Sequence, residues 1–106
     1  MIPAARRFCW DDIPLDKVTE MVSRKEICAG GDGLAQTYLK KGALVPLHAH
    51  EASQWVYVLQ GALAVTIGSE VQMLREGEVL RISPRTEHQA EALEDTFVLD
   101  LRSAGR

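Results

Sequence analysis

Apolar and polar residues alternate in short stretches along most of the chain, and turn-forming residues separate these stretches at short, even intervals. A period of two places successive side chains on opposite faces of a β-strand, and glycine-rich turns between such stretches are typical of hairpins. The alternation therefore predicts an all-β protein. The expected strands cover residues 22–27, 34–39, 43–50, 54–60, 62–67, 70–74, 79–82, 88–92 and 96–102.

The chain has 106 residues, a length that suits one domain. We interpret residues 1–106 as a single domain whose barrel covers residues 21–102. Residues 1–20 precede the barrel as an N-terminal arm or dimer-contact segment. Within and just after this arm, residues 16–21 favour one helical turn.

Several middle strands carry apolar residues on both faces. Val56 and Val58 alternate with Trp55 and Tyr57, and residues 62–67 show a similar pattern. Strands of this kind are covered on both sides. One cover is the barrel interior, and in so small a chain the second cover is expected to be another subunit. We therefore predict a homodimer.

Composition and charge narrow the range of partners. Hydrophobic residues make up 46% of the chain and charged residues 25%, as in ordinary globular proteins. Twelve Lys and Arg against fifteen Asp and Glu give a net charge of −3, and no basic block indicates nucleic-acid binding. No apolar run suits a membrane span or a signal peptide, so we expect a cytoplasmic protein without a membrane partner. Cys9 and Cys28 lack metal-site spacing and are interpreted as small buried hydrophobes.

All three histidines of the chain fall at positions suited to one metal ion. His48 and His50 lie two apart in an expected strand, where such residues face the same side. Gln54 follows four residues later, and His88 begins a strand across the sheet. Three imidazole nitrogens and one oxygen suit one divalent transition metal ion, namely Ni, Zn, Fe, Mn or Cu.

Two alternatives to this ligand set stay open. A His-x-His pair on a half-exposed strand is in general polar surface rather than a site. Glu51 and Glu87 also lie close enough in sequence to replace Gln54 as the oxygen donor.

The spacing of these residues resembles the first motif of the cupin superfamily, G-x5-H-x-H-x3-E-x6-G. The matching positions are Gly42, His48, His50, Gln54 and Gly61, with Gln in place of Glu. The resemblance implies a double-stranded β-helix, the jelly-roll barrel of cupins, and a metal bound by this set together with His88.

The second cupin motif, G-x5-P-x-G-x2-H-x3-N, is matched in part. Gly77 and His88 keep its separation, whereas Pro84 stands one place late. Thr86 lies in the region of the second glycine, and Ala92 replaces Asn.

Within the cupins, the chain resembles the KdgF-like pectin-degradation proteins. The segments that carry this resemblance are 23–25, 39–43, 57–61, 92–96 and 98–100. The resemblance implies conversion of cyclic 4,5-unsaturated uronates to their linear keto form, with Asp100 as the catalytic aspartate. Arg102 stands where that family has an aromatic residue, and Arg106 has the separation from Asp100 that its tail arginine shows.

In the last expected strand, Asp100 shares a face with Val98 and Arg102. If this face looks into the barrel, Asp100 can act as a general acid or base, and Arg102 can bind a substrate carboxylate. Alternatively, the two form a surface ion pair, or Arg102 neutralises Asp100. Candidates for lining the pocket are Gln36, Tyr57, Arg24 and Arg81, whereas Trp55 and Met73 are assigned to the core or a subunit interface.

Neutral ligands leave the charge of a divalent ion uncompensated, so the site favours anions. One unit charge about 4 Å away is worth roughly 4 kcal/mol at an effective dielectric near 20. We expect a metal-dependent isomerase or lyase that acts on a small anionic, sugar-like substrate, with the metal as Lewis acid. The alternatives are a cupin dioxygenase and a non-catalytic metal-binding or small-molecule-binding module.

Overall fold

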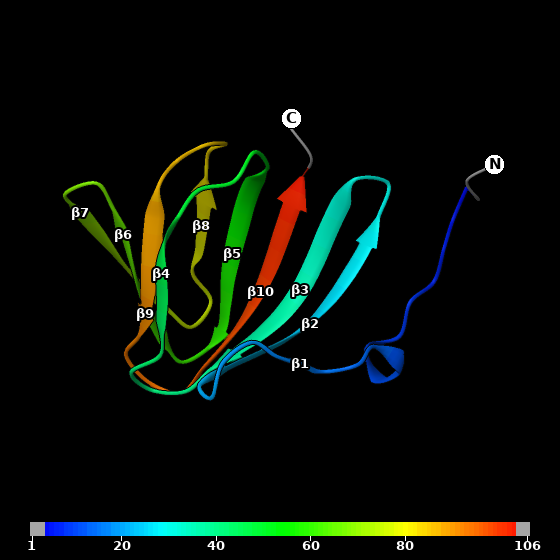
Figure 1. Ribbon diagram of the computed structural model, residues 1–106, viewed down its shortest axis with the longest axis horizontal. Coiled ribbons are helices and arrows are strands. Elements are labelled where there is room, and N and C mark those ends of the chain that lie inside the picture. Colours follow the sequence, from blue (N-terminus) through cyan, green and yellow to red (C-terminus); the bar gives the residue numbers. More distant parts are fainter. Residues whose placement is uncertain (1–3, 104–106) are drawn as a thin grey trace.

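Two antiparallel β-sheets face each other in the computed structural model, which describes residues 4–103 (Figure 1). One turn of 3-10 helix, η1 (Trp10–Asp12), precedes the strands. The strands are β1 (Asp16–Lys17), β2 (Val22–Ala29), β3 (Asp32–Leu39), β4 (Leu44–His48), β5 (Ser53–Gln60), β6 (Ala62–Ile67), β7 (Glu70–Arg75), β8 (Val79–Ile82), β9 (His88–Ala92) and β10 (Thr96–Ser103).

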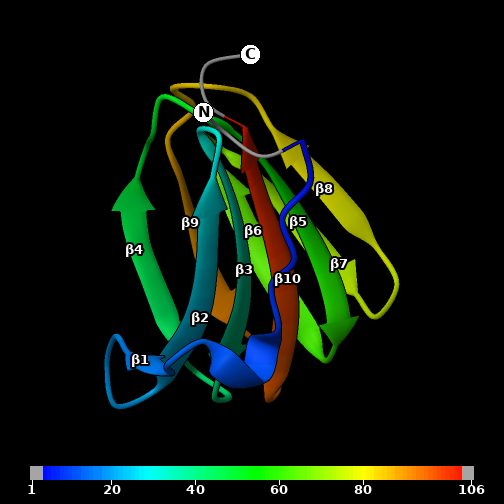
Figure 2. The same cartoon turned by 90° about the vertical axis from the view of Figure 1, so that its right-hand side faces the viewer.

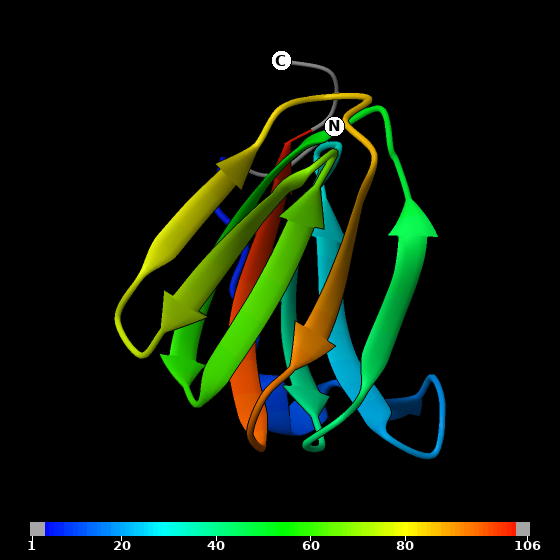
Figure 3. The same cartoon turned by 90° about the vertical axis from the view of Figure 1, so that its left-hand side faces the viewer.

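The strand order shows that chain neighbours are distributed between the two sheets. One sheet has the order β1-β2-β3-β10-β5-β8, and the other has the order β4-β9-β6-β7. Figure 2 looks onto the six-stranded sheet, and Figure 3 looks onto the four-stranded one. The predicted all-β jelly roll is confirmed. Among residues 4–103, no helix is long and apolar enough to cross a membrane.

The core lies between the two sheets and consists mainly of valine, leucine and alanine. Inward residues alternate with outward ones along each strand, as the sequence pattern predicts. On β5, for example, Val56 and Val58 are buried, while Trp55 and Tyr57 point outward. The buried core residues are Val22, Leu39, Ala43, Val56, Val58, Leu63, Val65, Leu74, Ile82, Ala92 and Val98.

The helical turn expected over residues 16–21 is wrong. Asp16 and Lys17 form the short strand β1, which pairs with β2. The backbone N–H groups of Val18 and Thr19 both donate to the carbonyl oxygen of Val22, which closes a tight reversal between the two strands. Pairing with β2 therefore satisfies backbone groups that a helical turn would have satisfied locally.

The burial expected of four residues also needs correction. Cys9 and Cys28 are free thiols on the surface, because Cys9 precedes η1 and Cys28 lies near the hairpin end of β2. Trp55 is 44% exposed and Met73 is 51% exposed, so neither belongs to the core of this chain. Both side chains lie on outer sheet faces, and their assignment to a subunit interface stays a prediction.

The turns before β6 and β9 depend on residues in the left-handed region. Gly61 has a φ of 95°, and a Cβ there would lie 2.5 Å from the carbonyl oxygen of Asp95. Arg85 has a φ of 57°, and it is the only non-glycine residue with positive φ among residues 4–103. The second cupin motif has its second glycine at this position, so Arg85, rather than Thr86, takes over that backbone conformation.

Candidate metal centre

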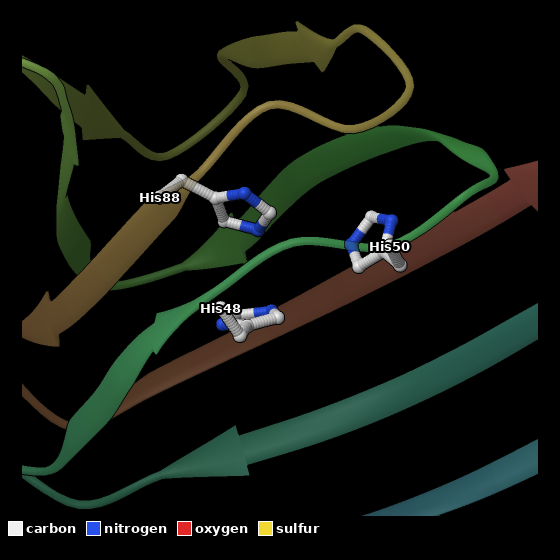
Figure 4. Close-up of side chains that lie close together, drawn as sticks. All are labelled: His48, His50 and His88. Atoms are coloured by element: carbon white, nitrogen blue, oxygen red, sulfur yellow. The ribbon is translucent and has the colours of Figure 1, made fainter.

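The three histidines of the chain meet at one end of the space between the sheets. His48 ends β4, His50 lies in the loop that follows, and His88 begins β9. The ring centroids of His48 and His88 are 4.3 Å apart, and those of His50 and His88 are 5.2 Å apart. One nitrogen from each ring lies within 4.8 Å of the others (Figure 4). Three histidines in this arrangement could hold a metal ion.

Backbone carbonyl groups orient all three rings. The Nδ1 atom of His48 lies 2.8 Å from the carbonyl oxygen of Pro46, and Nδ1 of His88 lies 2.8 Å from that of Thr86. The Nδ1 atom of His50 lies 2.9 Å from the carbonyl oxygen of Ala52. A carbonyl only accepts, so each neutral ring carries its proton on Nδ1 and leaves the Nε2 lone pair for a metal.

The side-chain oxygen of Gln54 lies next to the Nε2 atom of His50. The Nε2 atom of Gln54 donates to Asp100 Oδ1 at 2.8 Å, so the amide oxygen turns the other way and lies 2.8 Å from His50 Nε2. The lone pairs of His50 Nε2 and Gln54 Oε1 repel each other at this distance unless a proton or a metal ion binds between them. A proton would give the His50 ring a positive charge next to the other two histidines. One metal ion can instead bind both lone pairs. The donor set therefore fits a metal ion.

Burial keeps His88 in the form that binds metals. The side chain is 3% exposed, and this burial lowers the pKa of His88 below its usual value. The nearby His48 and His50 lower the pKa further, while the hydrogen bond to Thr86 opposes both effects. A lower pKa favours the neutral imidazole, which is the ligand.

Asp100 lies next to the candidate metal ligands and is hydrogen-bonded to one of them, Gln54. Its two carboxylate oxygens accept hydrogen bonds from Gln54 Nε2 and from Thr37 Oγ1, the latter at 3.2 Å. Burial raises the pKa of Asp100, although the bonds from Gln54 and Thr37 and the nearby Arg102 act against this rise. A carboxyl group with raised pKa beside the histidines suits proton transfer.

A cavity of about 180 Å³ joins these residues inside the fold. Its walls are mostly apolar residues, and its polar groups come from His48 and His88, from Thr19 and from strands β2, β3, β5 and β10. The charged side chains that line it are Arg24, Asp100 and Arg102. Two guanidinium groups against one carboxylate make the cavity suited to an anion.

Arg102, which lines this cavity, has an unused hydrogen-bond donor. Its Nε atom is buried and has no hydrogen-bond partner among the described residues. Within residues 4–103, no ion pair joins Arg102 to Asp100, whose oxygens are already bonded to Gln54 and Thr37. A buried donor without a partner is costly, so a ligand that accepts from Nε would stabilise it.

The comparisons with known proteins agree with this geometry. The cupin domain family matches residues 36–101. The chain belongs to the cupin family. A comparison with curated proteins found no match.

Among solved structures, this cupin is similar to KdgF from Halomonas sp., with 29% sequence identity and a TM-score of 0.86. The match covers 97% of this chain and 96% of that one. An RmlC-like cupin from Shewanella frigidimarina has 21% identity and a TM-score of 0.85, over 96% of this chain and 94% of that one.

Oxalate decarboxylase of Bacillus subtilis, which has Mn(II) centres, shares the fold at 23% identity and a TM-score of 0.83. That match covers 92% of this chain but only 29% of the decarboxylase.

The structure places the remaining candidates of this cupin in two groups. Arg24 lines the cavity, whereas Gln36, Tyr57 and Arg81 do not line it. Glu51 and Glu87 are exposed, and the group of side chains among residues 4–103 that could hold a metal ion contains no carboxylate. Gln54 is therefore the better placed oxygen donor.

Sequence reasoning missed Thr37, which bonds Asp100 from the neighbouring strand. The pairing of β3 with β10 sets Thr37 beside Val98, next to Asp100 on the same face. Strand alternation would have put Thr37 on a face with Ala35 and Leu39, but only the register shows that it reaches Asp100.

Proposed function

We propose that this cupin is a metal-dependent isomerase or lyase that acts on a small anionic, sugar-like substrate, as in KdgF-like linearisation of unsaturated uronates. In this proposal, His48, His50, Gln54 and His88 hold one divalent transition metal ion. Asp100 carries the proton and Arg102 binds the substrate carboxylate. The metal supplies Lewis acidity toward substrate oxygens.

The observation that carries the proposal is the double role of the Gln54 side chain. Its oxygen faces His50 Nε2, and its nitrogen donates to Asp100. One amide thus fixes the distance between the ligand set and the proposed proton carrier. A surface Asp–Arg pair would not need this link.

The residues around Asp100 support proton transfer in an isomerisation. Linearisation of a cyclic unsaturated uronate moves a proton from one substrate atom to another and needs no oxidant. Asp100 takes up and returns this proton, while the donors of Gln54 and Thr37 hold the carboxyl group in place. Arg102 offers its buried Nε to the substrate carboxylate. This contact orients the substrate so that its reacting atoms lie near Asp100.

The test is Asp100→Asn in the metal-loaded protein. Turnover of a 4,5-unsaturated uronate is expected to fall about 10²- to 10⁴-fold, the usual contribution of a general acid or base. Metal content, measured by elemental analysis, is expected to stay unchanged. Glu91→Gln, an exposed carboxylate on β9, is the matched control and should keep full turnover. Unchanged turnover in Asp100→Asn would remove the proton-carrier role.

The two alternative functions give different results in the same assay. A dioxygenase would consume oxygen and require iron or copper, whereas the isomerase would work with redox-silent Zn. A non-catalytic binding module would bind the anion and show no turnover with any of these metals.

A further inference from the structure

A second arginine faces the cavity from the strand next to β3. Arg24 on β2 lines the same cavity as Asp100 and Arg102. In the sheet, Arg24 pairs with Thr37, and Thr37 pairs in turn with Val98 on β10. The strands β2 and β10 thus lie on either side of β3, roughly 10 Å apart. Along β10, Arg102 comes four residues after Val98, the residue that is level with Arg24.

The strand between the two arginines carries only small side chains at the intervening positions. Ala35 pairs with Asp100 on one side and with Glu26 on the other, and Gly33 pairs with Arg102 and Cys28. A Cβ added at Gly33 would meet the Glu26 carboxylate at 3.5 Å and no backbone atom within 4 Å. These small side chains leave room for Arg24 and Arg102 to line one cavity.

Arg24 has a carboxylate partner within the protein. Its Nη2 lies 2.8 Å from Glu26 Oε2, and the two side chains are 25% and 36% exposed. Glu26 stands two residues along β2, on the same face as Arg24. The Glu26 carboxylate thus binds the Arg24 guanidinium, which a second anionic group of a ligand could otherwise bind.

We propose that Arg24 is a specificity-determining residue that binds a second acidic group of the substrate, and that Glu26 competes with this group. The inference rests on the proposed function: a uronate with one carboxylate uses Arg102 alone, whereas a small sugar-like diacid uses both arginines and binds more tightly. One carboxylate binds at Arg102, beside Asp100 and the metal ligands. The carbon chain lies in the cavity that both arginines line, and the other carboxylate displaces Glu26 from Arg24.

The test compares two open-chain ligands with the same carbon skeleton, galactarate as the diacid and galactonate as the monoacid. Binding to the metal-loaded protein is measured by isothermal titration calorimetry. Galactarate is expected to bind about tenfold or more tightly, because one additional charge-assisted contact is gained. Metal content and thermal unfolding are checked for every variant, so that loss of fold or metal is recognised.

Substitutions of the two residues of the Arg24–Glu26 ion pair are expected to change galactarate affinity in opposite directions. Arg24→Met is expected to weaken galactarate binding about tenfold and to leave galactonate binding within about twofold. Glu26→Gln is expected to strengthen galactarate binding, because the competing carboxylate is gone. If the pair were only structural, both substitutions would act in the same direction.

Three results would overturn the inference. They are equal affinity for the two ligands, no binding of either ligand, and weaker galactarate binding in Glu26→Gln. All three are binding measurements, so they are separate from the turnover assay. Loss of turnover in every assay, with the diacid preference intact, would instead count against the proposed enzyme activity alone.

Discussion

At the scale of single residues, the amide of Gln54 sets the charge of the site. A glutamate at this position, as in the first cupin motif, would bring one negative charge to the ligand set and remove the donor that Asp100 accepts from. Gln54→Glu is therefore expected to raise metal affinity about tenfold and to lower turnover and anion binding. Metal titration and ligand calorimetry measure both effects.

The control for this prediction adds the same charge away from the site. Gln60 is exposed at the end of β5 and does not line the cavity. Gln60→Glu should leave metal affinity and anion binding unchanged. Equal effects of the two substitutions would show that net charge, rather than the position of Gln54, controls binding.

The proposed metal binding by the three histidines also predicts an effect on stability. A ligand that binds only the folded chain, present at about 100 times its dissociation constant, adds about 2.7 kcal/mol. For a domain of this size, that corresponds to a Tm increase of roughly 10–20 °C. We expect this increase when Zn or Mn is added to the metal-free protein. His48→Ala should not respond, and a similar increase in that variant would place the metal elsewhere.

At the scale of elements, the turn before β6 depends on Gly61. A side chain there would meet the backbone of Asp95 and Thr96 at 2.5–2.8 Å, in addition to the left-handed φ of 95°. Gly61→Ala is expected to destabilise the fold by about 2–4 kcal/mol. Gly68 has a φ of 62° and open space around it, so Gly68→Ala should cost about 1 kcal/mol. Chemical denaturation measures the difference, and equal losses would contradict the steric argument.

The strand boundaries show which parts of the fold could be predicted from the sequence. Period-two alternation predicted β6, β8 and β9 with their observed bounds, because these strands end at turns marked in the sequence. It placed His50 in a strand, whereas β4 ends at His48 after a shift in register. The rings still meet, because the loop after β4 and its carbonyl groups orient His50.

The candidate site was predictable where it depends on spacing and not where it depends on register. His48, His50 and Gln54 could be found from the first cupin motif and His88 from the second. Asp100 could be found from the family resemblance, and strand alternation gave the face that it shares with Arg102. Thr37 and Glu26 act through neighbouring strands or through a paired side chain, and no local pattern identifies them. The exposed positions of Trp55 and Met73 were missed because an apolar residue on an outer face looks the same in sequence as one in the core.

At the scale of the whole molecule, the outer face of the six-stranded sheet has an uncovered apolar surface. Leu101 pairs with Trp55, and Tyr57 pairs with Val79, all on this face. Their exposed fractions run from 39% for Tyr57 and Leu101 to 51% for Val79. Large contiguous apolar patches of this kind mark interaction surfaces. This surface supports the proposal of a homodimer that uses the six-stranded sheet.

The dimer proposal is tested by introducing a charge on each outer face. Light scattering after size exclusion should give twice the chain mass for the unchanged protein. Leu101→Glu should give the mass of one chain, because a buried unpaired carboxylate at the interface is costly. Val71→Glu puts the same charge on the outer face of the four-stranded sheet, where Val71 is 55% exposed, and should remain dimeric. A single-chain mass for the unchanged protein, or dissociation by Val71→Glu alone, would exclude this interface.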